Sequence, residues 1–325
     1  QDSWTSFPKV VDLLERITPP PPSGLFDDFF GYPKWNTNEE MQLRNSLLKI
    51  GTLGAKAARD ALLDAGRRHA NRRNSLWARM GRAPLAEPIA HLSLIAERST
   101  QQPAGAIPEA IATSYKEGLW QIDAAAMAAL AAVHTKADTD AVSEALKACY
   151  VPWLEQTASR FQDAVRKQGG LNPSMPGTTS LEQGLCTIFV DGLRYDVAVD
   201  LSKRLECLGS VSVDTQWTSL PSVTSSGKAW VSPVAHRITG QPTDVEFQPS
   251  VTNSAKPLST YHFRKLLDDE GIQFLAFNET GQPAGRAWTE CGDLDHFGHE
   301  HQLRLARELP NQMAQIVERI QELAE

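Results

Sequence analysis

The chain has 325 residues, of which 41% are hydrophobic, so it can bury the cores of two domains and disorder is not its default state. Asp and Glu total 39 against 32 Lys and Arg, and the net charge of −7 argues against a protein coated in basic residues for wrapping nucleic acid. Four cysteines stand far apart without Cys-x-x-Cys spacing, which favours reduced thiols in a cytoplasmic protein over a zinc ribbon or a disulfide framework.

The N-terminus begins with Gln1 and has no basic-then-apolar secretory pattern, so we expect an internal piece of a longer protein. The most apolar run, Ala124 to Val133, is much shorter than the ~20 residues that cross a bilayer. The sequence therefore predicts no transmembrane segment.

Apolar residues recur at helical spacing from about Asn38 to Lys167, which predicts a helical domain over residues 1–168. Pro and Gly interrupt the pattern near 19–24 and 101–105, and again at 169–177, where we place the start of a linker over 169–182.

A basic patch is expected on the helices of this first domain. Its residues are Arg67, Arg68, Arg72, Arg73, Arg79 and Arg82. The patch is either a solvated helix face or a contact for nucleic acid.

The pattern changes beyond the linker, where residues 183–325 alternate strand and helix signals. The apolar run from Leu185 to Val190 is typical of a parallel strand covered on both faces. A helix should follow through Val197 and Leu208, ended by Gly209 in a left-handed conformation. Alternation from Val211 to Trp217 then predicts a second strand, completing a βαβ unit.

The same alternation continues toward the C-terminus. A helix is expected from Tyr261 to Glu270 and a strand from Ile272 to Phe277. An amphipathic helix covers His301 to Glu325, where Pro310 either kinks it or begins a second helix. The economical interpretation is an α/β domain with a mostly parallel sheet, whose ligands bind beyond the carboxyl ends of the strands.

Asp191 occupies such a position, directly after the first apolar strand and before Gly192. A carboxylate here can bind a metal ion, and the glycine lets the backbone turn sharply; capping of the next helix is the structural alternative. Arg194 can either pair with Asp196 or bind phosphate.

Hydroxyl side chains gather between Pro221 and Gly227, where a loop is expected to enter a helix. Free N–H groups at a helix start bind phosphate oxygens, which makes Ser225 a candidate phosphate ligand, although helix capping also explains one or two of these hydroxyls. A hydroxyl needs a base or a metal ion to become a nucleophile near neutral pH.

Asp295 and His299 combine a carboxylate and an imidazole in one short segment, with His296 and His301 beside them. Zinc commonly takes such oxygen and nitrogen ligands. Clustering of histidines in a polar loop is the alternative explanation.

Taken in order, FVDGLRYD at 189–196, LPSVTS at 220–225 and Asp295-x-x-Gly298-His299 resemble the PglZ family of the alkaline phosphatase superfamily. PglZ proteins belong to BREX-type bacteriophage defence systems. The match covers about residues 184–325, and the helical region resembles the segment that precedes the PglZ domain in these larger proteins.

The resemblance implies a hydrolase of phosphomonoesters or phosphodiesters, including nucleic acids, with two metal ions that are usually zinc. Asp191 and Thr224 would bind the first ion, and Thr224 would be the nucleophile. Asp295 and His299 would bind the second. Ser222, Ser225 and Ser226 rival Thr224, but the Pro-x-x-Thr position favours Thr224.

One departure from the family pattern is important. The later Asp-His-Gly motif and a still later His are not found, which leaves two family ligands for each ion against about four that zinc fills. We expect an alkaline-phosphatase-like domain that is truncated here, so that this chain alone binds metal weakly and is inactive.

A different class of function is a scaffold that binds other BREX proteins or DNA without hydrolysis. A sulfatase or phosphomutase fits less well, because Pro221 to Thr224 does not provide the Cys/Ser-x-Pro-x-Arg context of sulfatases.

Overall fold

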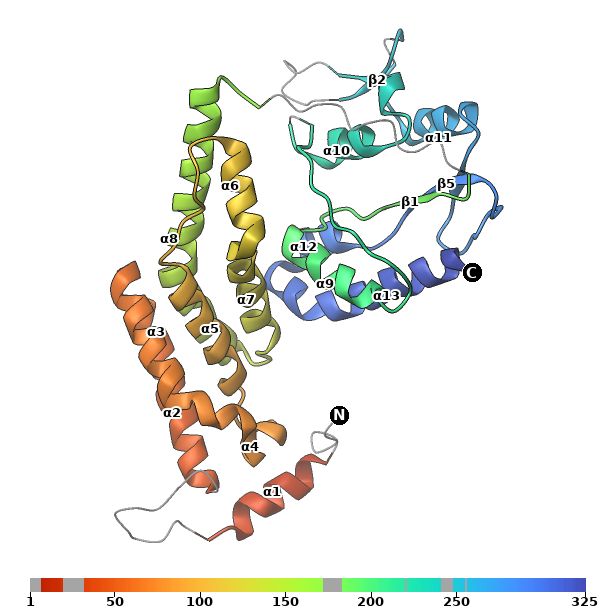
Figure 1. Cartoon of the computed structure of the whole chain (residues 1–325). Helices are drawn as coiled ribbons and strands as arrows, with labels where there is room; N and C mark the ends of the chain where they lie inside the picture. The colour runs from red at the N-terminus through yellow and green to blue at the C-terminus, as the bar shows by residue number, and fades with distance from the viewer. Residues whose placement is uncertain (1–6, 20–31, 172–182, 220, 241–247, 255) are drawn as a thin grey trace. The chain divides into compact units, whose positions relative to one another are not determined.

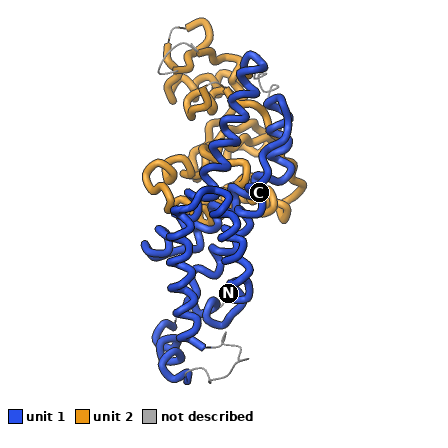
Figure 2. The backbone as a smooth tube through the Cα atoms, turned by 90° about the vertical axis from the view of Figure 1, so that its left-hand side faces the viewer, with its two compact units in different colours: residues 1–170 blue, residues 171–325 orange. Residues whose placement is uncertain are grey.

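The computed structural model describes residues 7–19, 32–171, 183–219, 221–240, 248–254 and 256–325. The chain divides into two compact units, residues 1–170 and 171–325, which Figure 2 distinguishes by colour. The first unit is mainly helical, and the second contains a small parallel sheet among helices (Figure 1). The predicted α/β class with a helical N-terminal region is confirmed at this level. None of the helices within these ranges combines the length and apolar character needed to span a bilayer.

The first unit is built from helices of very different length. They are α1 Pro8–Ile17, α2 Pro33–Ile50, α3 Ala55–His69, η3 Ala70–Asn74, α4 Leu76–Arg79, α5 Ala86–Arg98, α6 Pro108–Ser114, η4 Tyr115–Leu119, α7 Trp120–Ala131 and α8 Lys136–Gln168. Helix α8 begins where the Thr135 hydroxyl accepts a hydrogen bond from the backbone N–H of Asp138, and it ends at Gly169, which has a left-handed φ of 83°.

The core of the first unit lies between these helices. Helix α5 packs against α3 and α7, and α2 packs against α8. Each of these five helices, α2, α3, α5, α7 and α8, contributes fully buried residues to the core. Examples are Leu47, Leu62, Leu92, Ile122 and Val142. This burial of one apolar stripe per helix is the usual source of helix stability in a bundle.

The second unit alternates strands and helices. Its elements are β1 Cys186–Phe189, α9 Tyr195–Leu205, α10 Thr224–Val231, η5 Ala235–Arg237, β2 Ile238–Thr239, β3 Ser250–Val251, α11 Thr260–Asp269, β4 Ile272–Leu275, β5 Arg286–Glu290, α12 Leu294–His301, η6 Gln302–Arg304 and α13 Leu305–Ala324. The main sheet has the order β1-β5-β4, and both strand pairs are parallel, with Cys186 opposite Ala287 and Ile272 opposite Arg286.

Helices cover both faces of this sheet (Figure 1). Phe189 stacks on the buried Trp288 at a centroid separation of 5.9 Å, and both belong to the core beneath α11. The neighbouring Ile188 belongs to the opposite core, with Met313 and Ile316 of α13. Successive side chains of a strand point to opposite faces, which explains why the first strand is apolar without alternation.

Three local predictions are wrong. The segment from Val211 to Trp217 forms no strand, and Val211 and Val213 are 40% and 45% exposed, so its alternation buries no face. The predicted βαβ unit therefore lacks its second strand. Helix α9 ends at Leu205, and Gly209 does not have a positive φ, because the chain leaves the helix before it.

The C-terminal helix shows that Pro310 does not begin a second helix. Helix α13 continues through Pro310 from Leu305 to Ala324, and the break in the chain comes earlier, at Gln302, which has a positive φ of 47°. The predicted helix at 261–270 and strand at 272–277 are confirmed as α11 and β4.

Candidate active site

Asp191 lies in the turn that follows β1 and precedes α9. Gly192 next to it has a φ of 71°, the left-handed region that glycine adopts without strain. A Cβ atom added to Gly192 would lie 2.9 Å from the backbone nitrogen of Asp295 and 3.1 Å from its Cα. The turn therefore touches the start of α12 directly, and glycine makes this approach sterically tolerable.

The sheet topology explains why these two segments meet. Strands β1 and β5 are adjacent and parallel, so the residues that follow them emerge at the same edge. Asp191 follows β1, and Asp295 lies in the first turn of α12 after β5. The buried Gln312 of α13 accepts a hydrogen bond from the N–H of Asp293 at 3.0 Å, which fixes the entry into α12.

Asp295 and His299 face the same side of α12, as their spacing of four residues requires. Their Oδ1 and Nε2 atoms are 3.6 Å apart, and their side chains are 43% and 80% exposed. Both remain accessible to an incoming ion. The adjacent His296 instead approaches Glu300, at 3.5 Å, along the same helix.

The hydroxyl-rich loop enters a helix as predicted, and α10 begins at Thr224. Ser226 is buried, and its hydroxyl donates to the carbonyl oxygen of Val223 at 3.1 Å and also contacts that of Pro221. Burial and this local bonding make the Ser226 hydroxyl less accessible than the exposed hydroxyls beside it. Thr224 and its neighbours Ser222 and Ser225 are exposed.

Sequence reasoning missed an ion pair that joins α10 to the sheet. The Lys228 Nζ atom lies 2.5 Å from Oε1 of Glu290, the last residue of the central strand β5. Glu290 is in register with Phe189, two residues before Asp191. The spacing of Lys228 from Thr224 was visible in the sequence, but β5 was not predicted, so nothing indicated the partner.

Arg194 makes a bidentate ion pair with the buried Asp196, with distances of 3.0 Å from Nε and 3.2 Å from Nη2. The pairing that the sequence offered as one alternative is therefore present. The Arg194 side chain is 41% exposed, and its role in phosphate binding stays a prediction.

The donor types of the predicted site residues fit a divalent ion such as zinc, because they are carboxylates, a hydroxyl and an imidazole. Asp191, Thr224, Asp295 and His299 are the residues that would hold such ions. Within the described ranges, no three Asp, Glu, His or Cys side chains gather closely enough to form a ligand set. Asp295 and His299 are the two of these residues whose side chains lie close to one another.

The arginine-rich segment of the first unit differs from a basic surface. Arg72 is fully buried and pairs with Glu40, so it cannot contact nucleic acid. Four of the other arginines are also paired with carboxylates: Arg67 with Asp64, Arg68 with Glu39, Arg73 with Glu87, and Arg82 with Asp12 and Glu15. These carboxylates lower the positive charge that the arginines alone suggested.

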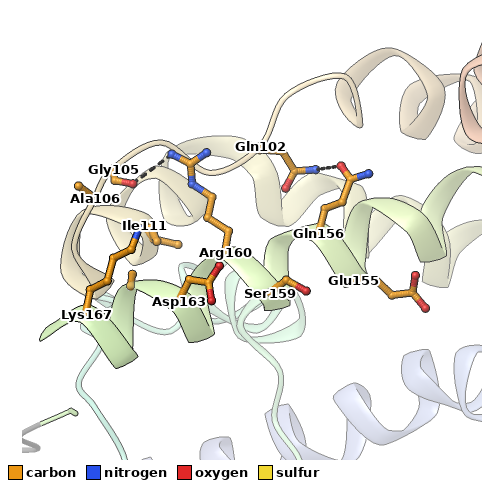
Figure 3. Close-up of a pocket in the computed structure, with 11 residues that line it drawn as sticks. Gln102, Gly105, Ala106, Ile111, Glu155, Gln156, Ser159, Arg160, Asp163 and Lys167 are labelled. Atoms are coloured by element: carbon orange, nitrogen blue, oxygen red, sulfur yellow. Dashed lines mark hydrogen bonds between the residues drawn. The ribbon is translucent and has the colours of Figure 1, made fainter. Parts of the chain in front are cut away.

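A groove of about 840 Å³ also lies in the first unit, along the C-terminal half of α8 (Figure 3). Arg160 crosses it to donate to the carbonyl oxygen of Gly105 at 3.1 Å, and Gln102 donates to Gln156 at 3.3 Å. The groove contains none of the residues predicted for phosphoester chemistry.

Comparison with known proteins adds no relative. No family model, curated protein or solved structure matches the chain.

Proposed function

We propose that the second unit belongs to a metal-dependent phosphatase or phosphodiesterase of the PglZ type, which acts in BREX-type phage defence. The contact of the Asp191 turn with the backbone of Asp295 is the observation that supports this proposal most directly. It brings two motifs about a hundred residues apart in the sequence to one edge of the sheet, the edge where α/β proteins bind ligands.

In the proposed reaction, the Thr224 hydroxyl gives up its proton as its oxygen attacks phosphorus, and the leaving oxygen takes up a proton as its bond to phosphorus breaks. The product is a phosphothreonine, which keeps the second ester group when the substrate is a diester. Water then attacks this phosphorus, and cleavage of its bond to the Thr224 oxygen releases phosphate or a monoester. Two divalent ions, when bound, would lower the pKa of the attacking hydroxyl and water and stabilise the charge on the phosphoryl oxygens. Arg194 and Ser225, which belong to the first and second motifs, are the candidate phosphate ligands in this proposal.

The ligand count sets the expected behaviour of this chain. With two family ligands for each ion against about four that zinc fills, we propose that metal binding is weak and that turnover is negligible. A chain that hydrolysed a nitrophenyl phosphodiester at an ordinary enzymatic rate, and lost this activity with Thr224→Ala, would contradict the proposed inactivity while supporting the nucleophile.

Zinc titration by calorimetry tests the metal site itself. We expect Asp191→Ala to weaken zinc binding at least ten-fold. Asp200→Ala is the matched control, because Asp200 is an exposed carboxylate of α9 that pairs with Arg204 at 2.8 Å. Equal affinities of the Asp191 and Asp200 variants would refute the proposed metal role of Asp191.

A scaffold function is the second candidate, and helix α1 favours it. Val11 of α1 is buried in a cluster with Trp77 and Met80, whereas Val10, Leu13 and Ile17 are 44%, 48% and 64% exposed. Three exposed apolar residues on one helix are a common feature of protein-binding surfaces. In a phage-defence assay, a scaffold would keep its function with Thr224→Ala and lose it with Leu13→Asp; the hydrolase predicts that Thr224→Ala abolishes defence.

A further inference from the structure

Helix α10 carries the proposed nucleophile at its first residue and a lysine one turn later. Residues four apart on a helix lie on the same face, so Thr224 and Lys228 share one side of α10. Whatever holds Lys228 in place therefore also limits where Thr224 can lie.

Lys228 is held by two contacts in the second unit. Its ammonium group is paired with Glu290, and it also lies 5.4 Å from the centroid of the Phe263 ring. The side chains of Lys228 and Glu290 are only 26% and 37% exposed, so water screens this pair less than it screens an ordinary surface pair.

Glu290 is itself fixed to the sheet. It accepts a hydrogen bond from Nε1 of the fully buried Trp288 at 3.3 Å, and it ends the central strand β5 opposite Phe189. Asp191 emerges two residues after Phe189 at the same edge. A continuous set of contacts thus leads from the strand that positions Asp191, through Glu290 and Lys228, to the helix that begins with Thr224.

We propose that the ion pair between Lys228 and Glu290 positions Thr224 beside Asp191 for their shared metal ion. Lys228 and Glu290 are positioning residues that act through α10 and β5, and they do not themselves touch the ion. This inference rests on the proposed function, because it assigns a means of alignment to the same site.

Cadmium binding to a thiol at position 224 tests the alignment without requiring turnover. The background variant is Cys207→Ser, which removes the exposed native thiol. In this background, Thr224→Cys should add a cadmium-thiolate absorption band, which is used to titrate cadmium binding. Adding Asp191→Ala should weaken the cadmium affinity measured from this band at least ten-fold. In this background we expect Lys228→Met or Glu290→Gln to weaken cadmium affinity about ten-fold. The double variant Lys228→Glu with Glu290→Lys should restore it to within about three-fold.

Arg204→Met is the matched control, since it removes an ion pair of α9 in the same unit, and it should leave cadmium affinity unchanged. The charge-reversed pair separates positioning from a general loss of stability, because it restores the contact with the same residue types. A band that does not depend on Asp191 would overturn the proposed function and this inference with it. A band that depends on Asp191 but is unaffected by Lys228→Met, or is not restored by the reversed pair, would overturn this inference alone.

Discussion

Gly192→Ala should damage the second unit more than an ordinary glycine substitution. Alanine in the left-handed region costs about 1–2 kcal/mol, of which about 0.4–1 kcal/mol is offset by the stiffer unfolded chain. The new methyl would also lie 2.9 Å from the Asp295 nitrogen, a backbone atom that cannot rotate away. Overpacking of this kind costs about 1–3 kcal/mol, so we expect a total loss of about 2–4 kcal/mol.

Gly271→Ala is a close control within the same unit. Gly271 has a similar φ of 66°, but a Cβ atom added there meets nothing within 4 Å. The control should lose only about 1 kcal/mol, because it keeps the backbone penalty without the clash. The difference between the two variants therefore measures the close approach of the Asp191 turn to α12.

Hydrogen exchange followed by mass spectrometry can resolve this effect in peptides of the second unit, and zinc titration of the same samples reports the site. We expect faster exchange around residues 186–193 and weaker zinc binding in Gly192→Ala only. Equal losses of stability in the two variants would refute the close approach. A destabilised Gly192→Ala chain with unchanged zinc affinity would separate the turn from the metal site.

Three further predictions concern buried polar groups. Burial, helped by the nearby Arg72 charge, lowers the pKa of His69 from 6.5 to about 4, so between these values the unfolded chain binds a proton that the native chain does not. The His69 contribution should therefore reduce the free energy of unfolding by about 2 kcal/mol from pH 7 to pH 5 in urea titrations; a His69→Gln chain with the same pH dependence as the parent would disprove it. Tyr150→Phe removes a hydroxyl donor from the buried Asp123 and should cost about 1–3 kcal/mol in thermal unfolding, and an unchanged melting temperature would argue against this contact. Arg319→Met removes donors to two backbone carbonyl oxygens and should destabilise the second unit by about 2–3 kcal/mol, measured by hydrogen exchange against Arg204→Met as an exposed control, whose equal loss would contradict the expectation.

The sequence predicted elements whose signals are local. Apolar periodicity predicted the helical region from about Asn38 to Lys167, although it did not reach α1, and the run before Asp191 predicted β1. The sequence did not predict strand β5, because its five residues begin with Arg286, end with Glu290 and show no clear apolar pattern. This segment forms a strand because it pairs with both β1 and β4. The segment from Val211 shows the reverse case, since alternation alone does not provide a partner strand.

The candidate site was likewise predictable only in part from the sequence. The motif residues were visible one segment at a time, but the approach of Gly192 to Asp295 depends on strand order, which no local pattern encodes. The sequence left the arginine cluster open between a solvated helix face and a nucleic-acid contact, and it did not show the pairing carboxylates, several of which come from other helices. The sequence did not distinguish the hydroxyl of Ser226 from that of Thr224, because the bond of the Ser226 hydroxyl to its own loop depends on the folded loop.

The sheet order has a consequence for synthesis of the protein. Strand β5 is the last of the three in the chain, yet it pairs with both β1 and β4, which do not pair with each other. During synthesis, β1 cannot pair with β5 until the residues of β5 have been made, because Cys186 lies opposite Ala287. Strand β1 therefore leaves the ribosome with apolar side chains and no partner strand. The helices of the first unit need no such delay, because their hydrogen bonds are local. Asp191 and Asp295 therefore come together in one late event, and the candidate site is assembled only after the helical unit has been synthesised.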